Sequence, residues 1–133
     1  MTDKYGIPLS VLLDSGNKHD LSFINKHIDD LVIVNKKNSS RNISLLADKG
    51  YVSSVLKETL YNRNYNLIYP AKSNMKPNAN FDICLYKKRI NVEHTFAKLK
   101  LFRRIQLRYD SDCMKYLLFI YLACSQLIYR FIC

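Results

Sequence analysis

The chain has 133 residues, of which 48% are apolar, and a formal net charge of +10 at pH 7. This length predicts one small domain over residues 1–133, and the apolar content excludes an intrinsically disordered chain. The excess of Lys and Arg indicates a polyanionic partner, most simply nucleic acid, although structural RNA-binding proteins have the same balance.

The first half of the chain predicts two strands with a helix between them. Residues 7–13 are apolar and bounded by turn residues, which is typical of a strand. Residues 20–30 are predicted as a helix that starts near Asp20, because apolar side chains recur on one face. Residues 43–47 form a continuous apolar run, so we predict a buried strand that ends at Asp48.

The next segment predicts one helix, one strand and one loop. Ser53 or Ser54 is expected to cap a helix that runs to about residue 61, with Val55, Leu56 and Leu60 facing inward. Residues 66–69 are predicted as a short strand stopped by a proline. Residues 72–80 are too rich in Asn and Lys to pack, so we predict a polar loop.

The last third predicts two long helices, with residues 103–109 between them forming a turn or an extended piece. The first helix is expected from Phe81 or Asp82 through about residue 102, and the second from about residue 112 to 131, capped by Asp110 or Ser111. The order of strands and helices indicates an α/β domain. The last helix is predicted to be a buried core helix, because its best apolar run is shorter than the roughly 18 residues of a membrane span.

The cysteines give no indication of a metal site. Cys84, Cys113, Cys124 and Cys133 contain no CxxC pair, so a zinc site is not expected. Residues 1–7 are polar and do not resemble a signal peptide. We therefore predict reduced, buried thiols in a cytosolic protein.

Four side chains of the first long helix are spaced as one group. Tyr86, Arg89, Glu93 and Lys100 follow each other at intervals of 3, 4 and 7 residues, which places them within a narrow arc of an α-helix. A lone carboxylate among cations is typical of an acid that handles a metal ion or phosphate. The alternative is a surface ion pair between Glu93 and Arg89, stabilising by a few tenths of a kcal/mol.

Asp48 is a second candidate, because functional groups in open α/β sheets gather beyond the carboxyl ends of strands. The alternative is that it begins a turn before Gly50. His94 follows Glu93 directly, so a helix would point it about 100° away, and we expect only a polar helix residue. His19 and Asp20 are potential metal ligands, but a turn with Asp20 as a helix cap explains them equally well.

Three blocks of residues, in this order, resemble the C-terminal part of the catalytic domain of insertion-sequence DDE transposases. Together they cover nearly the whole chain, and the second and third blocks are specific. The blocks are Gly6-Ile7-Pro8-Leu9 followed by Gly16-Asn17-Lys18-His19-Asp20; Leu45-Leu46-Ala47-Asp48-Lys49-Gly50-Tyr51; and residues 86–100 continued by Phe102-Arg103-Arg104-Ile105 and Arg108-Tyr109-Asp110.

The resemblance implies an RNase H-like α/β fold, incomplete at its N-terminus, and a metal-dependent DNA endonuclease and strand transferase. Asp48 and Glu93 match two of the family's three catalytic, metal-binding acids. The matched positions associated with donor DNA are Tyr86, Arg89 and Lys100, and we also expect Arg103 and Arg104 to bind DNA. The cofactor expected in the complete domain is a pair of Mg²⁺ or Mn²⁺ ions, because two metals can clamp the attacking and leaving oxygens of a phosphodiester.

The family's first catalytic aspartate has no counterpart, since neither Asp3 nor Asp14 occupies its place. We therefore expect the first strands and the first acid to be missing and the isolated chain to be inactive. A polypeptide from an overlapping upstream frame would supply that acid; alternatively, the chain is a decayed remnant.

The expected partners are DNA, both element ends and target, and the upstream polypeptide. Self-association into a homo-oligomer is an additional possibility, and no membrane partner is expected. The expected location is the cytoplasm, at the nucleoid. The rival functions are a non-catalytic basic nucleic-acid-binding module and a small membrane protein built around the last helix.

Overall fold

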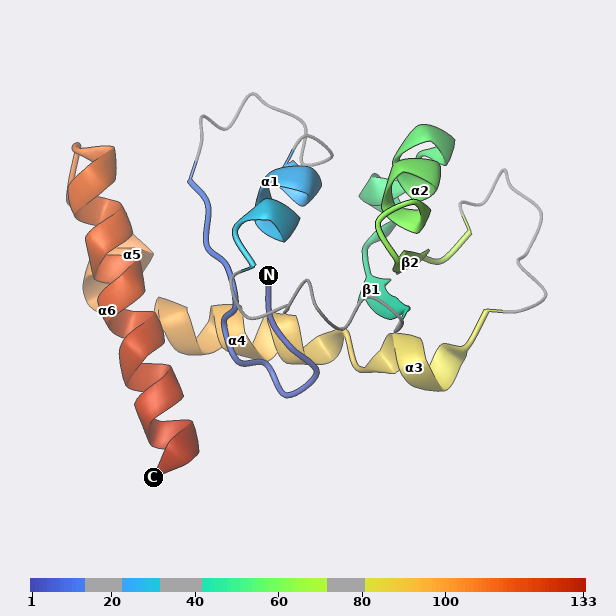
Figure 1. Ribbon diagram of the computed structural model, residues 1–133. Coiled ribbons are helices and arrows are strands. Elements are labelled where there is room, and N and C mark those ends of the chain that lie inside the picture. Colours follow the sequence, from blue (N-terminus) through green and yellow to red (C-terminus); the bar gives the residue numbers. More distant parts are fainter. Residues whose placement is uncertain (14–22, 32–41, 72–80) are drawn as a thin grey trace. The chain divides into compact units, whose positions relative to one another are not determined.

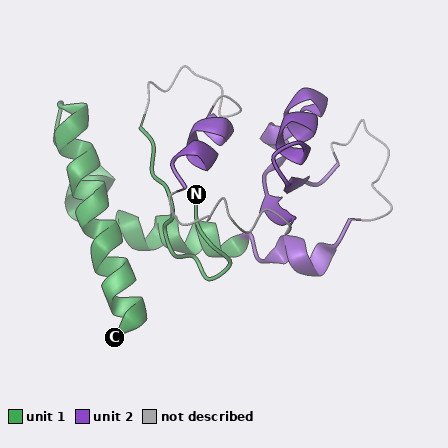
Figure 2. Ribbon diagram, in the orientation of Figure 1, with its two compact units in different colours: residues 1–17, 90–133 green, residues 18–89 purple. Residues whose placement is uncertain are grey.

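The computed structural model describes residues 1–13, 23–31, 42–71 and 81–133. Figures 1 and 2 show that the chain forms two compact units. The terminal unit comprises Met1–Asn17 and Ile90–Cys133, and the middle unit comprises Lys18–Arg89. The two candidate acids, Asp48 and Glu93, therefore belong to different units.

The middle unit contains a two-stranded parallel sheet. Strand β1 (Ile43–Leu46) pairs with β2 (Tyr65–Ile68), and helix α2 (Ser54–Tyr61) connects them (Figure 1). The Ser53 hydroxyl caps α2 by accepting a hydrogen bond from the Leu56 amide at 3.3 Å. The predicted α2 is confirmed, and the strand predicted at 66–69 is confirmed with both ends one residue earlier. The prediction of an α/β domain is confirmed at the level of this small sheet with several helices.

The core of the middle unit lies between α2 and β2. Leu60 of α2 is fully buried, with 0% of its surface exposed, and Leu56, Tyr65 and Leu67 are also buried. Val55 is 72% exposed, so its predicted inward orientation is wrong. The predicted burial of the strand at 43–47 is also wrong in part. Ile43 and Ser44 of β1 are exposed, and Leu45 and Leu46 are only partly buried.

Helix α1 (Phe23–Asp29) lies within the predicted helix 20–30 and buries Ile24 and Ile28. Arg63, which follows α2, forms an ion pair with Asp29 at the end of α1, with 2.5 Å between nitrogen and oxygen. The predicted start at Asp20, the candidate ligands His19 and Asp20, and the predicted loop 72–80 lie outside the described residues.

The terminal unit packs α4 (Ile90–Lys100), α5 (Arg103–Leu107) and α6 (Cys113–Ile132) around a small core. The residues of this core are Leu99, Ile120, Ala123 and Cys124, with Val11, Phe102, Ile105, Tyr116 and Leu127 packed against them. The Tyr116 hydroxyl donates a hydrogen bond to the Ile105 carbonyl at 3.0 Å, which ties α6 to α5. Residues 103–109 were predicted as a turn or an extended piece, and this is wrong because α5 packs on α6.

Helix α6 confirms the last predicted helix but corrects two details. Its cap is Asp112, which accepts a hydrogen bond from the Met114 amide at 2.9 Å, and neither Asp110 nor Ser111. The prediction of a buried core helix holds for one face only: Ile120, Ala123 and Cys124 are in the core, but only 17% of the most apolar window of α6 is buried. By length and composition alone, α6 could also cross a membrane.

The described cysteines are free, but the prediction of buried thiols holds only for Cys124. Burial raises the pKa of the Cys124 thiol. Cys84, Cys113 and Cys133 are exposed, and Cys113 and Cys133 lie at the two ends of α6.

The strand predicted at 7–13 is absent from the described residues 1–13, where the single bridge joins Thr2 to Pro8. The Asp3 carboxylate accepts hydrogen bonds from the amides of Tyr5 and Ile7, at 2.9 and 2.8 Å, and so closes a turn. Gly6 sits in this turn with a φ of +88°, which favours glycine. The segment is therefore a loop.

The single long helix predicted from residue 82 to 102 is wrong as a continuous element. Helix α3 (Ile83–Lys87), capped by Asp82 as predicted, is separated from α4 by Lys88 and Arg89. The amides of these two residues bond three positions back, to Leu85 and Tyr86, at 3.1 and 3.0 Å. One continuous helical face therefore does not extend from Tyr86 to Lys100.

Candidate functional site

Asp48 lies two residues beyond the end of β1 and is exposed. The Ala47 amide donates to the Ile68 carbonyl at 2.9 Å, so pairing with β2 continues up to the residue before Asp48. The Asp48 Oδ1 atom accepts a hydrogen bond from the Lys49 amide at 2.7 Å and caps the short helix η3 (Lys49–Tyr51). Asp48 therefore agrees with both interpretations of the sequence. Its side chain stabilises a turn, and it also presents a carboxylate at the carboxyl end of a parallel strand.

Glu93 lies in the first turn of α4 and is exposed, as is the neighbouring His94. A carboxylate in the first turn of a helix is favoured by the helix dipole, typically by 0.3–1 kcal/mol. This placement keeps the carboxylate at the surface of the terminal unit, where it remains accessible to a ligand.

The α4 helix is fixed to the N-terminal loop by contacts that the sequence did not reveal. The Thr95 hydroxyl lies 2.5 Å from the Gly6 carbonyl and 2.9 Å from the Asn91 carbonyl, and the Asn91 side-chain amide donates to the Lys4 carbonyl at 2.7 Å. A Cβ atom on Gly6 would lie only 2.8 Å from the Thr95 hydroxyl oxygen. Gly6 therefore permits the close approach that holds the helix of Glu93. In the sequence, the importance of Gly6 was indicated by its place in the first of the three blocks.

Two of the predicted DNA-binding residues contact each other in the middle unit. The Arg89 guanidinium lies 5.9 Å from the centre of the Tyr86 ring, and that ring lies 5.1 Å from the Phe81 ring. Arrangements of this kind, a cation against an aromatic face, are worth about 0.5–1 kcal/mol at exposed sites. Tyr86 therefore orients Arg89.

The remaining predicted DNA-binding residues lie in the terminal unit. Lys100 ends α4 and Arg103 begins α5, and both are exposed. Arg104 forms contacts within the unit: its guanidinium lies 3.7 Å from the Asp110 carboxylate and 4.4 Å from the centre of the Phe119 ring. Arg104 therefore links α5 to α6, a structural role that its place in the sequence block did not indicate.

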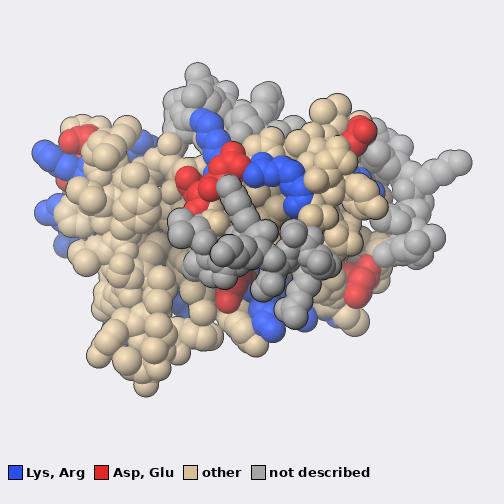
Figure 3. Space-filling view, viewed as in Figure 1, with Lys and Arg blue, Asp and Glu red and all other residues tan. Residues whose placement is uncertain are grey.

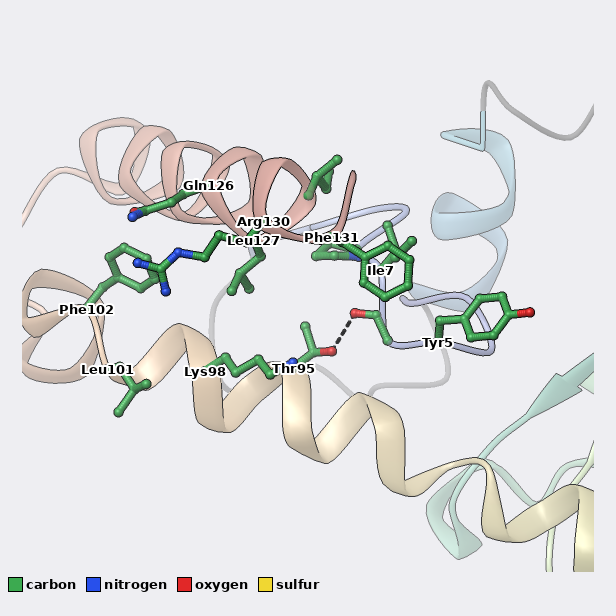
Figure 4. Close-up of a pocket in the computed structure, with 13 residues that line it drawn as sticks. Tyr5, Ile7, Thr95, Lys98, Leu101, Phe102, Gln126, Leu127, Arg130 and Phe131 are labelled. Carbon is green, nitrogen blue, oxygen red and sulfur yellow. Dashed lines mark hydrogen bonds between the residues drawn. The ribbon is translucent and has the colours of Figure 1, made fainter. Parts of the chain in front are cut away.

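A hollow of about 530 Å³ lies within the terminal unit, between the N-terminal loop, α4 and α6 (Figure 4). Apolar side chains dominate its walls, and Lys98 and Arg130 contribute positive charge. None of the predicted site residues lines it. On the face shown in Figure 3, basic and acidic side chains lie interspersed.

The structure brings Tyr86 close to Arg89, and places Asp48 and Glu93 on separate units as exposed carboxylates. In the four described ranges, no group of three or more His, Cys, Asp or Glu side chains is placed to hold a metal ion. Exposed carboxylates are suitable donors for hard cations such as Mg²⁺, but the described residues do not by themselves assemble the full set of ligands.

Comparison with known proteins gives one family. The family model described as "Transposase DDE domain" matches residues 1–128, which is nearly the whole chain. No curated protein and no solved structure matches the chain.

Proposed function

Because the chain belongs to the transposase DDE domain family, we propose that it is the C-terminal part of an RNase H-like catalytic domain that cuts and joins DNA. The family match over residues 1–128 carries this proposal, since it includes every predicted site residue. The family acts in DNA transposition, so DNA is the partner. We place this activity in the cytoplasm, at the nucleoid.

We propose Asp48 and Glu93 as two of the catalytic carboxylates. The support is that each is exposed at a place where a ligand can approach, Asp48 past the end of a strand and Glu93 in the first turn of a helix. The family typically uses a divalent metal ion, and Mg²⁺ or Mn²⁺ bound by three acids would stabilise the charge of a phosphodiester during cleavage. The Lys49 amide, which donates to Asp48 Oδ1, orients that carboxylate.

We propose that the third carboxylate comes from the N-terminal part of the complete catalytic domain, which a polypeptide encoded upstream would supply in the experiment. Asp3 does not fit the role, because its carboxylate accepts hydrogen bonds from two amides of its own loop. The chain alone should therefore show no metal-dependent nicking. Mixing or fusing it with the upstream polypeptide should restore Mg²⁺- or Mn²⁺-dependent nicking at the element's ends. Metal-dependent cleavage by the purified chain alone that is insensitive to Asp48→Asn and to Glu93→Gln would show that the proposed site is wrong.

The Arg89→Ala/Lys100→Ala double variant should bind DNA more weakly and with a flatter salt dependence. Phosphate contacts release counterions, and each contributes about 0.9 to the slope of log affinity against log salt. Losing two contacts should lower the slope by about 1.8 without changing sequence preference, because phosphates carry no base information. Fluorescence anisotropy with duplex DNA at several salt concentrations measures this slope.

The matched control is Lys57→Ala/Lys115→Ala, which also removes two exposed positive charges. Neither residue belongs to the proposed DNA-binding set, so the slope should change by clearly less than in the first variant. Equal slopes in the two double variants would mean that Arg89 and Lys100 do not contact phosphate.

The second candidate function is a non-catalytic basic nucleic-acid-binding module. It is favoured by one observation, that Asp48 already has a structural task as the cap of η3. The two functions differ in the reconstitution experiment above: a binding module would bind DNA with the same salt dependence, but no partner polypeptide would make it nick DNA.

A further inference from the structure

Helix α6 has two apolar faces, and the core of its unit covers one of them. The covered side chains recur at helical spacing and are Tyr116, Ile120, Ala123, Cys124 and Leu127. The opposite face, which we call the outer stripe, consists of Met114, Leu118, Tyr121, Leu122, Ser125, Tyr129 and Ile132. With about 3.6 residues per turn, these side chains fall within an arc of about 100° along the full helix.

The outer stripe is exposed over its whole length. The exposed fractions are 65% for Met114, 62% for Leu118, 66% for Leu122, 67% for Tyr129 and 76% for Ile132. Taking about 200 Å² for a fully exposed large side chain, the stripe leaves roughly 750 Å² uncovered. Contiguous apolar patches of this size mark interaction sites.

We propose that the outer stripe is a self-association surface, on which α6 pairs antiparallel with α6 of a second copy of this chain. Two such stripes would cover roughly 1,500 Å², which is the area of a standard stable interface. A twofold axis requires the same patch on both partners, and an uncharged stripe on one helix satisfies this requirement. The only charged side chains of α6, Lys115 and Arg130, lie outside the stripe.

The polar groups of the stripe are compatible with burial in an interface. The Ser125 hydroxyl donates to the Tyr121 carbonyl of its own helix at 2.9 Å, so it needs no partner from the other copy. The tyrosines combine apolar rings with hydroxyls that can reach the rim, and tyrosine is enriched in interfaces for this reason.

The sizes of the side chains favour the antiparallel arrangement. With the twofold axis at the level of residue 123 along the helix, Tyr121 of each copy lies opposite Ser125 of the other, and Met114 lies opposite Ile132. The Tyr121–Ser125 pairs then match a large side chain with a small one, as tight packing requires, and the Met114–Ile132 pairs match two apolar side chains. A parallel pair would place tyrosine against tyrosine and serine against serine, with a clash and a void, and would also align the two helix dipoles.

Sedimentation of the full chain tests self-association. Wild type should dimerise with rising concentration, and Leu118→Glu/Leu122→Glu should raise the dimer dissociation constant at least about 100-fold, because it buries unpaired charge. The matched control is Leu101→Glu/Leu107→Glu, which changes two exposed leucines outside the stripe and should leave dimerisation unchanged. Circular dichroism reports whether each variant is folded.

Three results would overturn the proposal: a wild-type monomer at all concentrations, equal weakening by both double variants, or co-sedimentation of wild type with neutral phosphatidylcholine vesicles in place of self-association. The last result would assign the stripe to a lipid surface.

Cysteine cross-linking tests the direction of pairing independently of variant stability. In a background with Cys84, Cys113 and Cys133 replaced by Ser, chains carrying Met114→Cys are mixed with chains carrying Ile132→Cys and oxidised. A disulfide needs Cβ atoms within about 4.5 Å, whereas the two ends of the stripe lie about 27 Å apart. Antiparallel pairing predicts a link between positions 114 and 132 by peptide mass spectrometry. Links of 114 to 114 and of 132 to 132, or no link, would overturn it.

Discussion

The Asp48→Asn and Glu93→Gln variants should each lose metal-dependent DNA nicking by about 1,000-fold or more when the chain is combined with the upstream polypeptide. Each substitution keeps the shape of the side chain and removes a negative charge that would balance bound metal ions. Metal ions supply several kcal/mol of transition-state stabilisation, and about 4 kcal/mol corresponds to this loss of rate. The measurement is the initial rate of nicking of a labelled element end in Mg²⁺ and in Mn²⁺.

The control for these variants is Glu58→Gln, which neutralises an exposed acid on α2 that lies outside the three sequence blocks. Its nicking rate should match wild type. DNA binding should persist in all three variants, because none removes a cation that contacts phosphate. If Asp48→Asn or Glu93→Gln nicks DNA as fast as Glu58→Gln, the corresponding acid is not catalytic.

The Leu60→Ala variant should lower the free energy of unfolding by about 3 kcal/mol. Leu60 is the largest fully buried side chain of the described chain, and it packs α2 against β2, the strand that pairs with the strand leading to Asp48. Removing it loses apolar burial and leaves a cavity, which together cost about 2–5 kcal/mol for a buried leucine. Urea denaturation followed by circular dichroism gives the change.

Val55→Ala on the same helix is the matched control, because Val55 is 72% exposed. Its effect should stay within about 0.5 kcal/mol. Similar destabilisation by Leu60→Ala and Val55→Ala would contradict the packing of α2 described above.

The elements predicted correctly are those with strong local signals. The α2 helix has a serine cap and inward leucines four residues apart, and β2 is a short apolar run stopped by Pro70. For α6, the sequence predicted the helix but not the outer stripe, since periodicity does not say how many faces a helix buries.

The errors arise where distant contacts decide the structure. The apolar run at 7–13 suggested a strand, but the Asp3 turn and the contact of Gly6 with Thr95, 89 residues away, make it a loop. Helix α5 forms because Ile105 and Arg104 contact α6. The helix breaks at Lys88 and Arg89, where the sequence has no glycine or proline to indicate a break. The group of Tyr86, Arg89, Glu93 and Lys100 was therefore expected on one continuous helix.

The candidate site could be predicted only as a set of residues. Asp48 could be placed at a strand end because an apolar run precedes it, and Glu93 on a helix because of its spacing. The pairings of Arg104 with Asp110 and Phe119 depend on the packing of α5 on α6, which no local pattern specifies.

The most direct test is the distance between the Asp48 and Glu93 carboxylates in a crystal structure of the chain bound to the upstream polypeptide and Mn²⁺. Two metal ions about 4 Å apart require these carboxylates to lie roughly 4–7 Å from each other, with anomalous Mn²⁺ signal between them. We predict that arrangement. Carboxylates on opposite surfaces, or Mn²⁺ bound without either of them, would contradict the assignment.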